Sequence, residues 1–524
     1  MGKGFKDHLI DAIAKVVSDT PVVDSIANKI AINFIIGTTP CRPSPWSTAH
    51  DYVSWTSLTN QNWMSRHLPA KQLRPPIHDN LADFFKRPDK KQTLSNVSTC
   101  LFPSFAQFLT DGFIRTKMPN KSKGDSDLLR KQTTSNNQLD LSQLYGRTED
   151  QTNALRVRSQ NSGFKGKLKS QIINGEEYAP FLFDGDANNY FIKEEFDGIL
   201  DRPLRLDFLL ENNLYDYIKV LFAFGGDRAN AAPQVAMITT LFLREHNRLA
   251  ALIEAEHLDW DDDHVFEVAR NNNILIYIRI IIEEYINHIS TTFDFKIDPS
   301  IAWKADWNRP NWVSTEFSLL YRWHSLIPDD MVWKRIAYPV RSTLLNNHLL
   351  INGGLKQGFI DMSSQKAGKL SAFNTAAALV DLEQSAINQG RLCQLTSYCD
   401  YRRHYSLDAP SKFEDISTNP AIVAFLKQAY SDVEDIEFYI GLFAEDTYDD
   451  EVLPELLGRM VAVDAFSQAL TNPLLSECVW AIREDVFTPS GLESYEQTRS
   501  LKDLLKRNVP DTLDDHDFIG MTQK

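Results

Sequence analysis

Residues 321–329 read Tyr321-Arg322-Trp323-His324-Ser325-Leu326-Ile327-Pro328-Asp329. The run is compatible with a helix, and a phenol three residues before an imidazole would share one face of that helix. An imidazole can hold a haem iron, and a phenol about one helical turn away can lose an electron and a proton to the oxidised cofactor. The pattern therefore indicates radical chemistry. The alternative for an isolated pair is a core helix with a satisfied histidine and a buried tyrosine.

Four other blocks accompany this run in chain order. They are Pro43-Ser44-Pro45 with Ala49-His50-Asp51-Tyr52-Val53-Ser54-Trp55, then Phe105-Ala106-Gln107, Leu243-Arg244-Glu245-His246-Asn247-Arg248-Leu249 and Asp400-Tyr401-Arg402-Arg403. With Glu316-Phe317 ahead of it, the run at 321–329 closely resembles the proximal segment of the cyclooxygenases, a branch of the animal haem peroxidase superfamily. The other blocks resemble further segments of that group. The resemblance covers roughly residues 40 to 480 and implies a helical haem-peroxidase catalytic domain.

Helical periodicity dominates over strand alternation along the chain. It predicts helices over 98–115, 235–256 and 266–289, and a polar surface loop over 116–138. We therefore predict a mainly α fold. No break in composition justifies a second large domain, so we expect a catalytic domain over 40–510, preceded by a short amphipathic segment over 1–39 and followed by a tail over 511–524.

The composition excludes several classes of protein. The 524 residues are 43% hydrophobic, enough to bury a large core, and the net charge of −15 argues against nucleic acid as a partner. The five cysteines are scattered without metal-ligand spacing and are odd in number, which argues against a secreted disulfide framework. The cytoplasm of a microbe is the predicted location, with peripheral membrane contact as an addition.

The amino-terminal segment is amphipathic. Apolar residues recur at helical spacing in two stretches, which predicts two short helices: Phe5, Leu9, Ile10, Ile13, Val16 and Val17, then Val22, Val23, Ile26 and Ile30. In the cyclooxygenases such helices rest on one membrane leaflet and form the mouth of the fatty-acid channel, which implies peripheral membrane contact through residues 1–36. The alternative is a helix pair that caps the domain. Both interpretations stay open.

The distal side of the expected haem departs from the resembled superfamily. Its members usually carry a glutamine and, four residues on, a histidine that moves the proton of a bound peroxide between its oxygens. Gln107 is present, but Asp111 stands at the histidine position. A carboxyl group there can do acid–base work if its pKa suits the task, and burial above a haem would raise that pKa. The alternative is weakened peroxide cleavage, with Asp111 only a tolerated polar residue.

The resemblance implies haem b held by His324 as the proximal iron ligand. Thr110 and Gly112 occupy the positions where mammalian peroxidases carry a haem-esterified aspartate and a calcium-binding aspartate. We therefore expect non-covalent haem. Asp140 and Ser142 match the rest of the calcium loop only in part, so no calcium is predicted.

An apolar channel to Tyr321 is the second implication of the resemblance. The candidate channel residues are Tyr285, Ile286, Phe317, Leu320, Trp323 and Ser467. Each of them is also compatible with a place in the core. The arginine and tyrosine that hold the substrate carboxylate in the cyclooxygenases become Thr38 and Thr292. The substrate head group then faces solvent, meets another cation such as Arg42, or is not a carboxylate.

The function implied by the resemblance is a haem-dependent fatty acid dioxygenase. A Tyr321 radical abstracts hydrogen from an unsaturated fatty acid or related lipid, O2 adds, and a hydroperoxide leaves, while Gln107 and Asp111 face the peroxide. The oligomeric state stays open, with a homodimer as one possible assembly because dimers are common in the resembled group. Two alternatives remain. One is a haem peroxidase of small molecules, supported by Gly225-Gly226-Asp227-Arg228, which resembles a segment carrying a distal arginine. The other is a non-catalytic lipid-binding scaffold.

Overall fold

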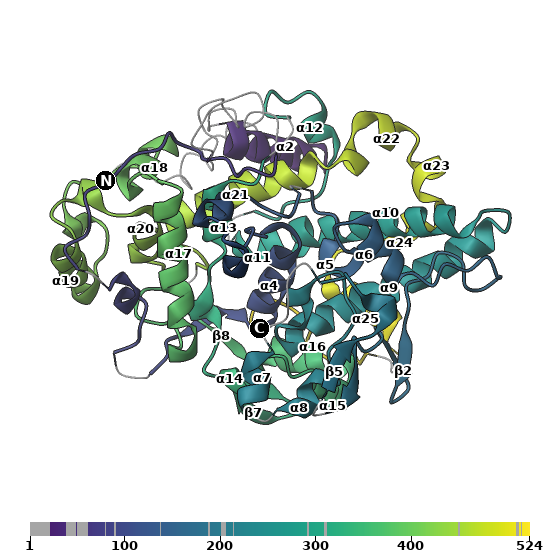
Figure 1. The fold of residues 1–524 in the computed structure, drawn as a ribbon. Helices are drawn as coiled ribbons and strands as arrows, with labels where there is room; N and C mark the ends of the chain where they lie inside the picture. Colours follow the sequence, from purple (N-terminus) through teal and green to yellow (C-terminus); the bar gives the residue numbers. More distant parts are fainter. Residues whose placement is uncertain are drawn as a thin grey trace.

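The structure is a computed structural model. It describes residues 21–37, 49, 61–78, 80–88, 91–136, 138–186, 189–200, 206–212, 214–290, 293–308, 312–448, 451–509, 513, 514 and 516–524. Helices make up most of the fold, as predicted, and the described strands form only two-stranded antiparallel sheets (Figure 1). In Figure 1, α17 to α20 gather on one side of the molecule and α9, α10, α24 and α25 on the other, with α4 and α13 between them.

The elements have the following bounds. The longer helices are α2 (Pro21–Gly37), α4 (Leu101–Phe113), α6 (Glu149–Leu155), α9 (Pro233–Glu256), α10 (Asp262–Ile280), α16 (Leu355–Ser364), α17 (Val380–Leu392), α18 (Tyr398–His404), α19 (Pro420–Ala429), α20 (Phe438–Ala444), α21 (Glu455–Leu470), α24 (Pro489–Glu496) and α25 (Leu501–Asn508). The shorter helices are α5 (Ser142–Tyr145), α7 (Asp207–Glu211), α8 (Tyr215–Ile218), α11 (Asn287–Ile289), α12 (Ser300–Trp303), α13 (Thr315–Leu320), α14 (Val340–Thr343), α15 (His348–Gly353), α22 (Glu477–Ala481) and α23 (Arg483–Phe487). The paired strands are β1 (Leu94–Thr99) with β8 (Lys366–Gly368), β2 (Gln171–Ile173) with β3 (Glu176–Tyr178), β4 (Phe183–Asp186) with β5 (Asn189–Ile192), and β6 (Asp330–Trp333) with β7 (Ile336–Pro339).

Helices α9 and α10 pack against each other and confirm two of the predicted helices. Helix α9 begins at Pro233, where the missing N–H of proline costs the helix nothing. Helix α10 begins earlier than predicted because Asp261 caps it, accepting a hydrogen bond of 2.8 Å from the His264 N–H. The helical path continues through a π-helical segment, Ile281–Ile286, into α11, so the predicted end near residue 289 is confirmed.

The predicted helix over 98–115 begins later than expected, at Leu101 in α4. Its first predicted residues belong instead to β1, which pairs with β8. The Thr99 N–H donates to the Met521 carbonyl at 2.8 Å, so a contact with the distant C-terminal residues decides the local conformation. The predicted loop over 116–138 is confirmed in its described residues, which form two short 3-10 turns, Lys121–Lys123 and Asp127–Lys131, and no α-helix or β-strand.

Helix α2 is the second of the two predicted amino-terminal helices, whereas the first lies outside the described residues. Its C-terminal half buries four apolar side chains against the domain: Ala31, Ile32, Ile35 and Ile36. It packs on α21 and α12, and the Trp307 indole N–H donates to the Asn33 side chain at 2.8 Å. For residues 21–37 these contacts support the interpretation as a capping helix. Lipid contact stays a prediction. None of the described helices combines the length and apolarity needed to cross a bilayer.

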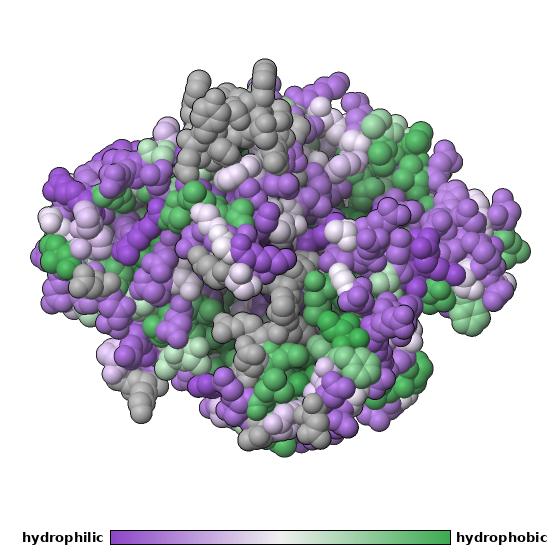
Figure 2. All heavy atoms as spheres, in the orientation of Figure 1, coloured by the Kyte–Doolittle hydropathy of each residue, from purple (hydrophilic) through white to green (hydrophobic). Residues whose placement is uncertain are grey.

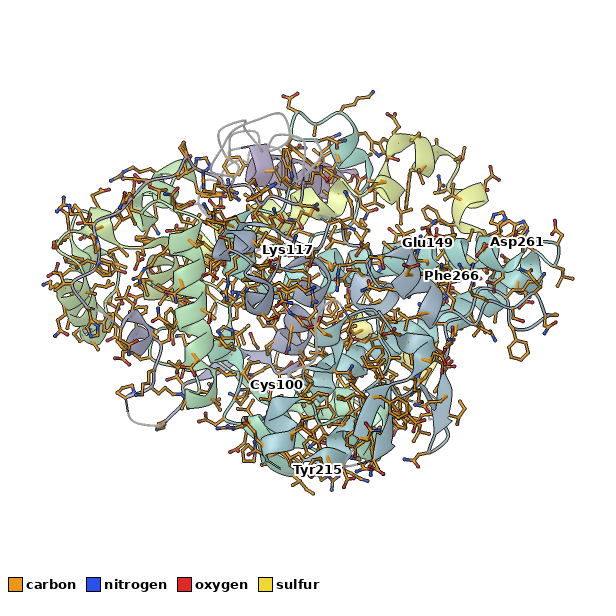
Figure 3. All side chains as sticks on the ribbon, in the orientation of Figure 1. Cys100, Lys117, Glu149, Tyr215, Asp261 and Phe266 are labelled. Carbon is orange, nitrogen blue, oxygen red and sulfur yellow. The ribbon has the colours of Figure 1, made fainter. Side chains whose placement is uncertain are left out.

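A continuous apolar core runs through the described part of the chain, from Ala31 in α2 to Met521 near the C-terminus. Hydrophilic side chains cover much of the face shown in Figure 2, interrupted by apolar patches. In Figure 3, Cys100 lies below the centre of the view, just before α4, and Asp261, the residue that caps α10, lies at the right-hand edge. The predicted domain boundaries at 39/40 and 510/511 stay predictions.

Candidate active site

Tyr321 and His324 do not share one continuous helix, which corrects the geometric premise drawn from the sequence. Helix α13 ends at Leu320, and Tyr321 is its C-cap residue with φ −97° and ψ 21°. Trp323 leaves the helical region, and His324 opens a 3-10 turn, His324–Leu326. The Leu326 N–H therefore bonds the Trp323 carbonyl, three residues back, at 3.0 Å. The two candidate side chains therefore project from the loop between α13 and the 3-10 turn.

Tyr321 lies in an aromatic cluster. Its ring centroid is 5.2 Å from that of Phe317, 5.0 Å from that of Trp323 and 6.3 Å from that of Phe113 in α4. Burial raises the pKa of the phenol well above its usual range, and the charge of Asp464 raises it further. The described residues offer its hydroxyl no hydrogen-bond partner. The phenol therefore keeps its proton at physiological pH and faces apolar surroundings.

His324, in the loop that carries Tyr321, is suited to hold an iron. Its Nδ1 lies 3.1 Å from Oε1 of the buried Glu383, while its Nε2 has no partner among the residues that the structure describes. The buried histidines His67, His246 and His288 use both ring nitrogens in hydrogen bonds. Iron coordination needs a nitrogen with a free lone pair, so those three are poor ligands and His324 is a good one.

Helix α4 carries Gln107, which is half-buried, and Asp111, which is buried one turn further on. Burial raises the pKa of Asp111 to about 6, and the charge of Arg228 opposes part of that rise. Arg228 Nη1 lies 4.0 Å from Asp111 Oδ1, and Asp111 Oδ2 has no hydrogen-bond partner in the described part of the chain. A carboxyl group that titrates near pH 6 with one free oxygen can accept and return a proton.

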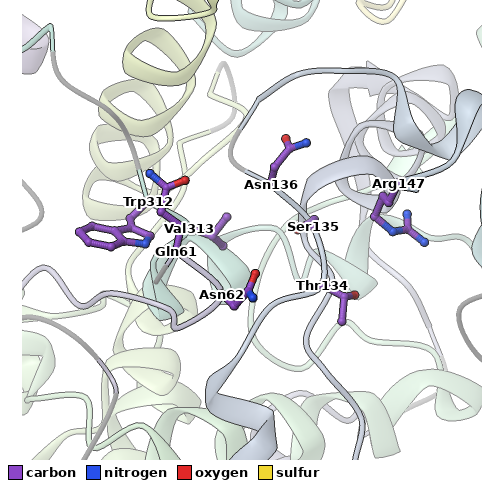
Figure 4. A pocket seen from close by; sticks show the side chains of 8 residues that line it. All are labelled: Gln61, Asn62, Thr134, Ser135, Asn136, Arg147, Trp312 and Val313. Atoms are coloured by element: carbon purple, nitrogen blue, oxygen red, sulfur yellow. The ribbon is translucent and has the colours of Figure 1, made fainter. Parts of the chain in front are cut away.

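Two polar side chains beside Asp111 were not predicted from the sequence. The amide of Gln143 in α5 is buried without a hydrogen bond of good geometry, and its Oε1 would lie 2.5 Å from a Cβ built on Gly112. The charge of Arg147 lowers the pKa of Asp111. Arg147 also lines a cavity of about 210 Å³, opposite Trp312 (Figure 4). Helices α4 and α5 are brought together only by the fold, so no local sequence pattern could have predicted that Gln143 lies beside Asp111.

The six predicted channel residues come from three neighbouring parts of the fold. Tyr285 and Ile286 belong to the π-helical segment, Phe317, Leu320 and Trp323 to α13 and the loop after it, and Ser467 to α21. Helix α21 packs on both α13 and the π-helical segment. Phe102 stacks on Tyr285 and on Trp323, with centroids 5.5 Å apart in each pair. All six are buried around the Tyr321 loop, and their role as a channel stays a prediction.

The remaining sequence predictions concern the substrate carboxylate and calcium. Thr38, Arg42 and Thr292 lie outside the described residues. Asp140 accepts hydrogen bonds from the Ser142 N–H at 2.9 Å and from the Asn136 side chain at 2.6 Å. The described residues contain no cluster of three His, Cys, Asp or Glu side chains placed to hold an ion. The absence of calcium stays a prediction.

The donor chemistry of these residues fits a haem. The imidazole of His324 has a free Nε2, and Asp111, with one unpartnered oxygen, lies on α4, whose Phe113 ring packs near that of Tyr321. A mainly helical protein with these features is a haem enzyme of the peroxidase class. Residues 103–517 match the animal haem peroxidase family, and the chain belongs to that family. It is a haem-dependent oxidoreductase.

Relatives confirm the resemblance to the cyclooxygenase-like branch. Prostaglandin G/H synthase 2 of Equus caballus is 28% identical over 485 residues, covering 89% of this chain and 74% of that protein. The Mus musculus protein of the same name is 27% identical over 515 residues, covering 94% of this chain and 78% of that protein. The blocks quoted from the sequence therefore identified the family correctly.

Solved structures share the fold at low sequence identity. A fatty acid alpha-dioxygenase of Arabidopsis thaliana has a TM-score of 0.66 at 16% identity, covering 96% of this chain and 90% of that one. Peroxidase A of Dictyostelium discoideum has a TM-score of 0.62 at 18% identity, covering 92% of this chain and 96% of that one. These values show a common architecture.

The raised pKa of Asp111 gives a stability prediction that needs no cofactor. The folded-state pKa of about 6 exceeds the ordinary value of 3.8, so folding favours the protonated form and loses stability as the pH rises through 6. Asp111→Asn removes that loss. The variant is expected to gain up to about 3 kcal/mol in the free energy of unfolding at pH 8 relative to pH 3.5, measured by urea denaturation of the apoprotein. Asp259→Asn, a change at an exposed acid, is the control, and parallel curves for Asp111→Asn and the native chain would contradict the assignment.

Proposed function

We propose that this chain is a haem-dependent fatty acid dioxygenase that works through a radical on Tyr321. The observation that carries the proposal is a half-buried phenol without a hydrogen-bond partner among the described residues, three residues from an imidazole whose Nε2 is free. The similarity to prostaglandin G/H synthases, and the fold shared with fatty acid alpha-dioxygenases, favour a fatty acid as the substrate.

In this proposal His324 would hold the haem iron through Nε2, and Gln107 and Asp111 would act on the bound peroxide. The bound haem supplies the oxidising equivalent, drawn from a peroxide, that starts the reaction. Asp111 would accept the proton of the incoming peroxide and return it to the leaving oxygen. Gln107 would orient the peroxide from the same face of α4.

Tyr321 then carries the chemistry on the lipid. As an oxyl radical it takes a hydrogen atom from the fatty acid and becomes a phenol, leaving a carbon radical. Molecular oxygen adds to that carbon, and the resulting peroxyl radical takes the hydrogen atom back from Tyr321, which releases a hydroperoxide and restores the radical. The aromatic cluster excludes water and places one carbon of the chain near the phenol oxygen.

The test of this function is oxygen consumption by the haem-loaded protein with a panel of unsaturated fatty acids. We expect uptake of one O2 for each hydroperoxide formed, started by a trace of peroxide. A protein that oxidises guaiacol but consumes no oxygen with any fatty acid would contradict the proposal. A protein without a Soret band would instead support the lipid-binding scaffold.

The second candidate function, a peroxidase of small molecules, rests on Arg228. The sequence suggested a distal arginine there, and its guanidinium lies 4.0 Å from Asp111. A cation beside the peroxide site stabilises the negative charge that develops on the leaving oxygen. Peroxidase activity can accompany the dioxygenase reaction, because both need the same distal groups.

Peroxide-dependent oxidation of a small phenol tests the role of Asp111. If Asp111 accepts the peroxide proton, its carboxylate form is active, so the rate should rise with pH through about 6. Asp111→Ala should lower the rate about 100-fold and remove that pH step. Thr110→Ala is a matched control on the same helix, since the Thr110 hydroxyl donates to the Gln107 carbonyl at 3.0 Å. An unchanged rate in Asp111→Ala, together with a gain in Asp111→His, would show that the site is weakened and that Asp111 is a tolerated residue.

A further inference from the structure

Glu383, in α17, is among the most buried carboxyl groups of the described chain, with 1% of its surface exposed. Helix α17 packs against α13, which brings Glu383 to the loop that carries His324. Its Oε1 lies 3.1 Å from His324 Nδ1. No lysine or arginine of the described chain forms an ion pair with Glu383, so the imidazole is the group through which this buried acid reaches the active site.

Two hydroxyl groups hold the Glu383 carboxyl in place. Tyr439 donates a hydrogen bond of 2.6 Å to Oε2, and Thr375 donates one of 2.9 Å to Oε1. The Tyr439 ring packs between two phenylalanines, with centroid distances of 5.4 Å to Phe85 and 5.1 Å to Phe443. The carboxyl group is therefore fixed in position by α20 and the segment before α17.

We infer that Glu383 is a positioning residue that sets the donor strength of His324 toward the iron. This inference rests on the proposed function, because it requires that Nε2 bind the iron. A carboxylate that accepts the Nδ1–H keeps the proton on Nδ1 and leaves the Nε2 lone pair free. Its negative charge also strengthens the imidazole as a donor, which stabilises the oxidised iron and lowers its reduction potential.

For Glu383 to act on His324 in this way, the Nδ1–H of the imidazole must point at the carboxylate. The distance of 3.1 Å is within hydrogen-bonding range, although Nδ1 has no hydrogen bond of good geometry there. This role requires that the ring turn so that its Nδ1–H points at Oε1, and a bond from Nε2 to the iron would hold the ring in that orientation. The competing explanation is that Glu383 only joins Thr375 and Tyr439, which is a structural role and would leave the iron unaffected.

The experiment compares the haem-loaded native chain with Glu383→Gln, which keeps the shape of the side chain and removes its charge. The reduction potential of the iron is expected to become more positive, and the iron–histidine stretching frequency of the ferrous protein is expected to fall. Haem affinity should drop by about 10-fold. Glu445→Gln is the control for loss of a buried glutamate charge, because Glu445 also accepts a tyrosine hydroxyl, at 2.7 Å from Tyr398. It differs from Glu383 in its ion pair with Arg402, and it has no contact with His324.

A second variant predicts the opposite sign. Tyr439→Phe removes the 2.6 Å donor from Oε2, so more negative charge remains for the imidazole and the potential should become more negative. Shifts of opposite sign in the two variants support the inference. Haem-loaded variants with the potential and stretching frequency of the native chain would overturn it and leave the proposed function standing. A native chain that binds no haem would overturn both.

Discussion

Tyr321→Phe is expected to abolish fatty-acid-dependent oxygen uptake and to leave haem binding and the Soret band unchanged. Phenylalanine keeps the ring that packs on Phe317 and Trp323, so the aromatic cluster survives. It lacks the O–H bond whose hydrogen atom is lost and regained in each cycle. An oxygen electrode, with an unsaturated fatty acid and a trace of peroxide, should record uptake no faster than the reaction without enzyme.

Tyr285→Phe is the control that separates Tyr321 from its neighbours. Tyr285 is a buried phenol in the same region, stacked on Phe102, and its hydroxyl also has no partner among the described residues. We expect this variant to lose less than about 10-fold of the oxygen uptake, since it changes only the channel wall. If Tyr285→Phe abolished uptake and Tyr321→Phe did not, the radical would be assigned to the wrong tyrosine.

His324→Gly is expected to abolish haem binding, with haem affinity falling by more than about 100-fold, a larger loss than removal of a group that only supports the ligand. The cavity left by the side chain should accept free imidazole. Adding imidazole should therefore restore part of the Soret band, whereas it cannot repair a misfolded protein. Absorption spectra during haem titration measure both effects.

His288→Gln provides the comparison for His324. The His288 ring lies 4.5 Å from Phe102, but its two nitrogens contact Ser98 at 3.0 Å and Thr522 at 2.7 Å. This variant should bind haem as the native chain does. Loss of the Soret band in His288→Gln, with retention in His324→Gly, would move the iron ligand to the other histidine.

The sequence predicted what depends on local pattern. Helices α9 and α10 follow from apolar periodicity over long windows, and the Asp261 cap explains the early start of α10. The block over 321–329, which keeps several residues of one loop together, identified the family in combination with the four other blocks that accompany it in chain order. The same block led to a wrong prediction of geometry, that Tyr321 and His324 share one face of a helix. The backbone at Tyr321 and Trp323 leaves the helical region before His324.

What the sequence could not predict depends on contacts between distant segments. Residues 98 and 99 are strand rather than helix because the C-terminal residues and β8 take their hydrogen-bonding groups. Glu383 sits in a helix whose sequence marks it only as one more acid, and only the packing of α17 on α13 brings it to His324. Gln143 reaches Gly112 for the same reason. Residues such as Glu383 and Gln143, which reach the candidate site from other helices, cannot be recognised from their spacing along the sequence.

The π-helical segment Ile281–Ile286 has a consequence for how this region tolerates change. Such a segment holds one residue more than a regular α-helix over the same path, so everything after it is turned by about 100°. That turn presents His288 to Ser98 and Thr522, which join β1 to the C-terminal end of the chain. Deletion of one residue within the segment would turn it into a regular α-helix and rotate His288 away from Ser98 and Thr522, so both hydrogen bonds would be lost. Substitutions on the outer face of the segment would leave the orientation of His288 unchanged. The length of this segment, more than its composition, therefore sets the orientation of the residues that follow it.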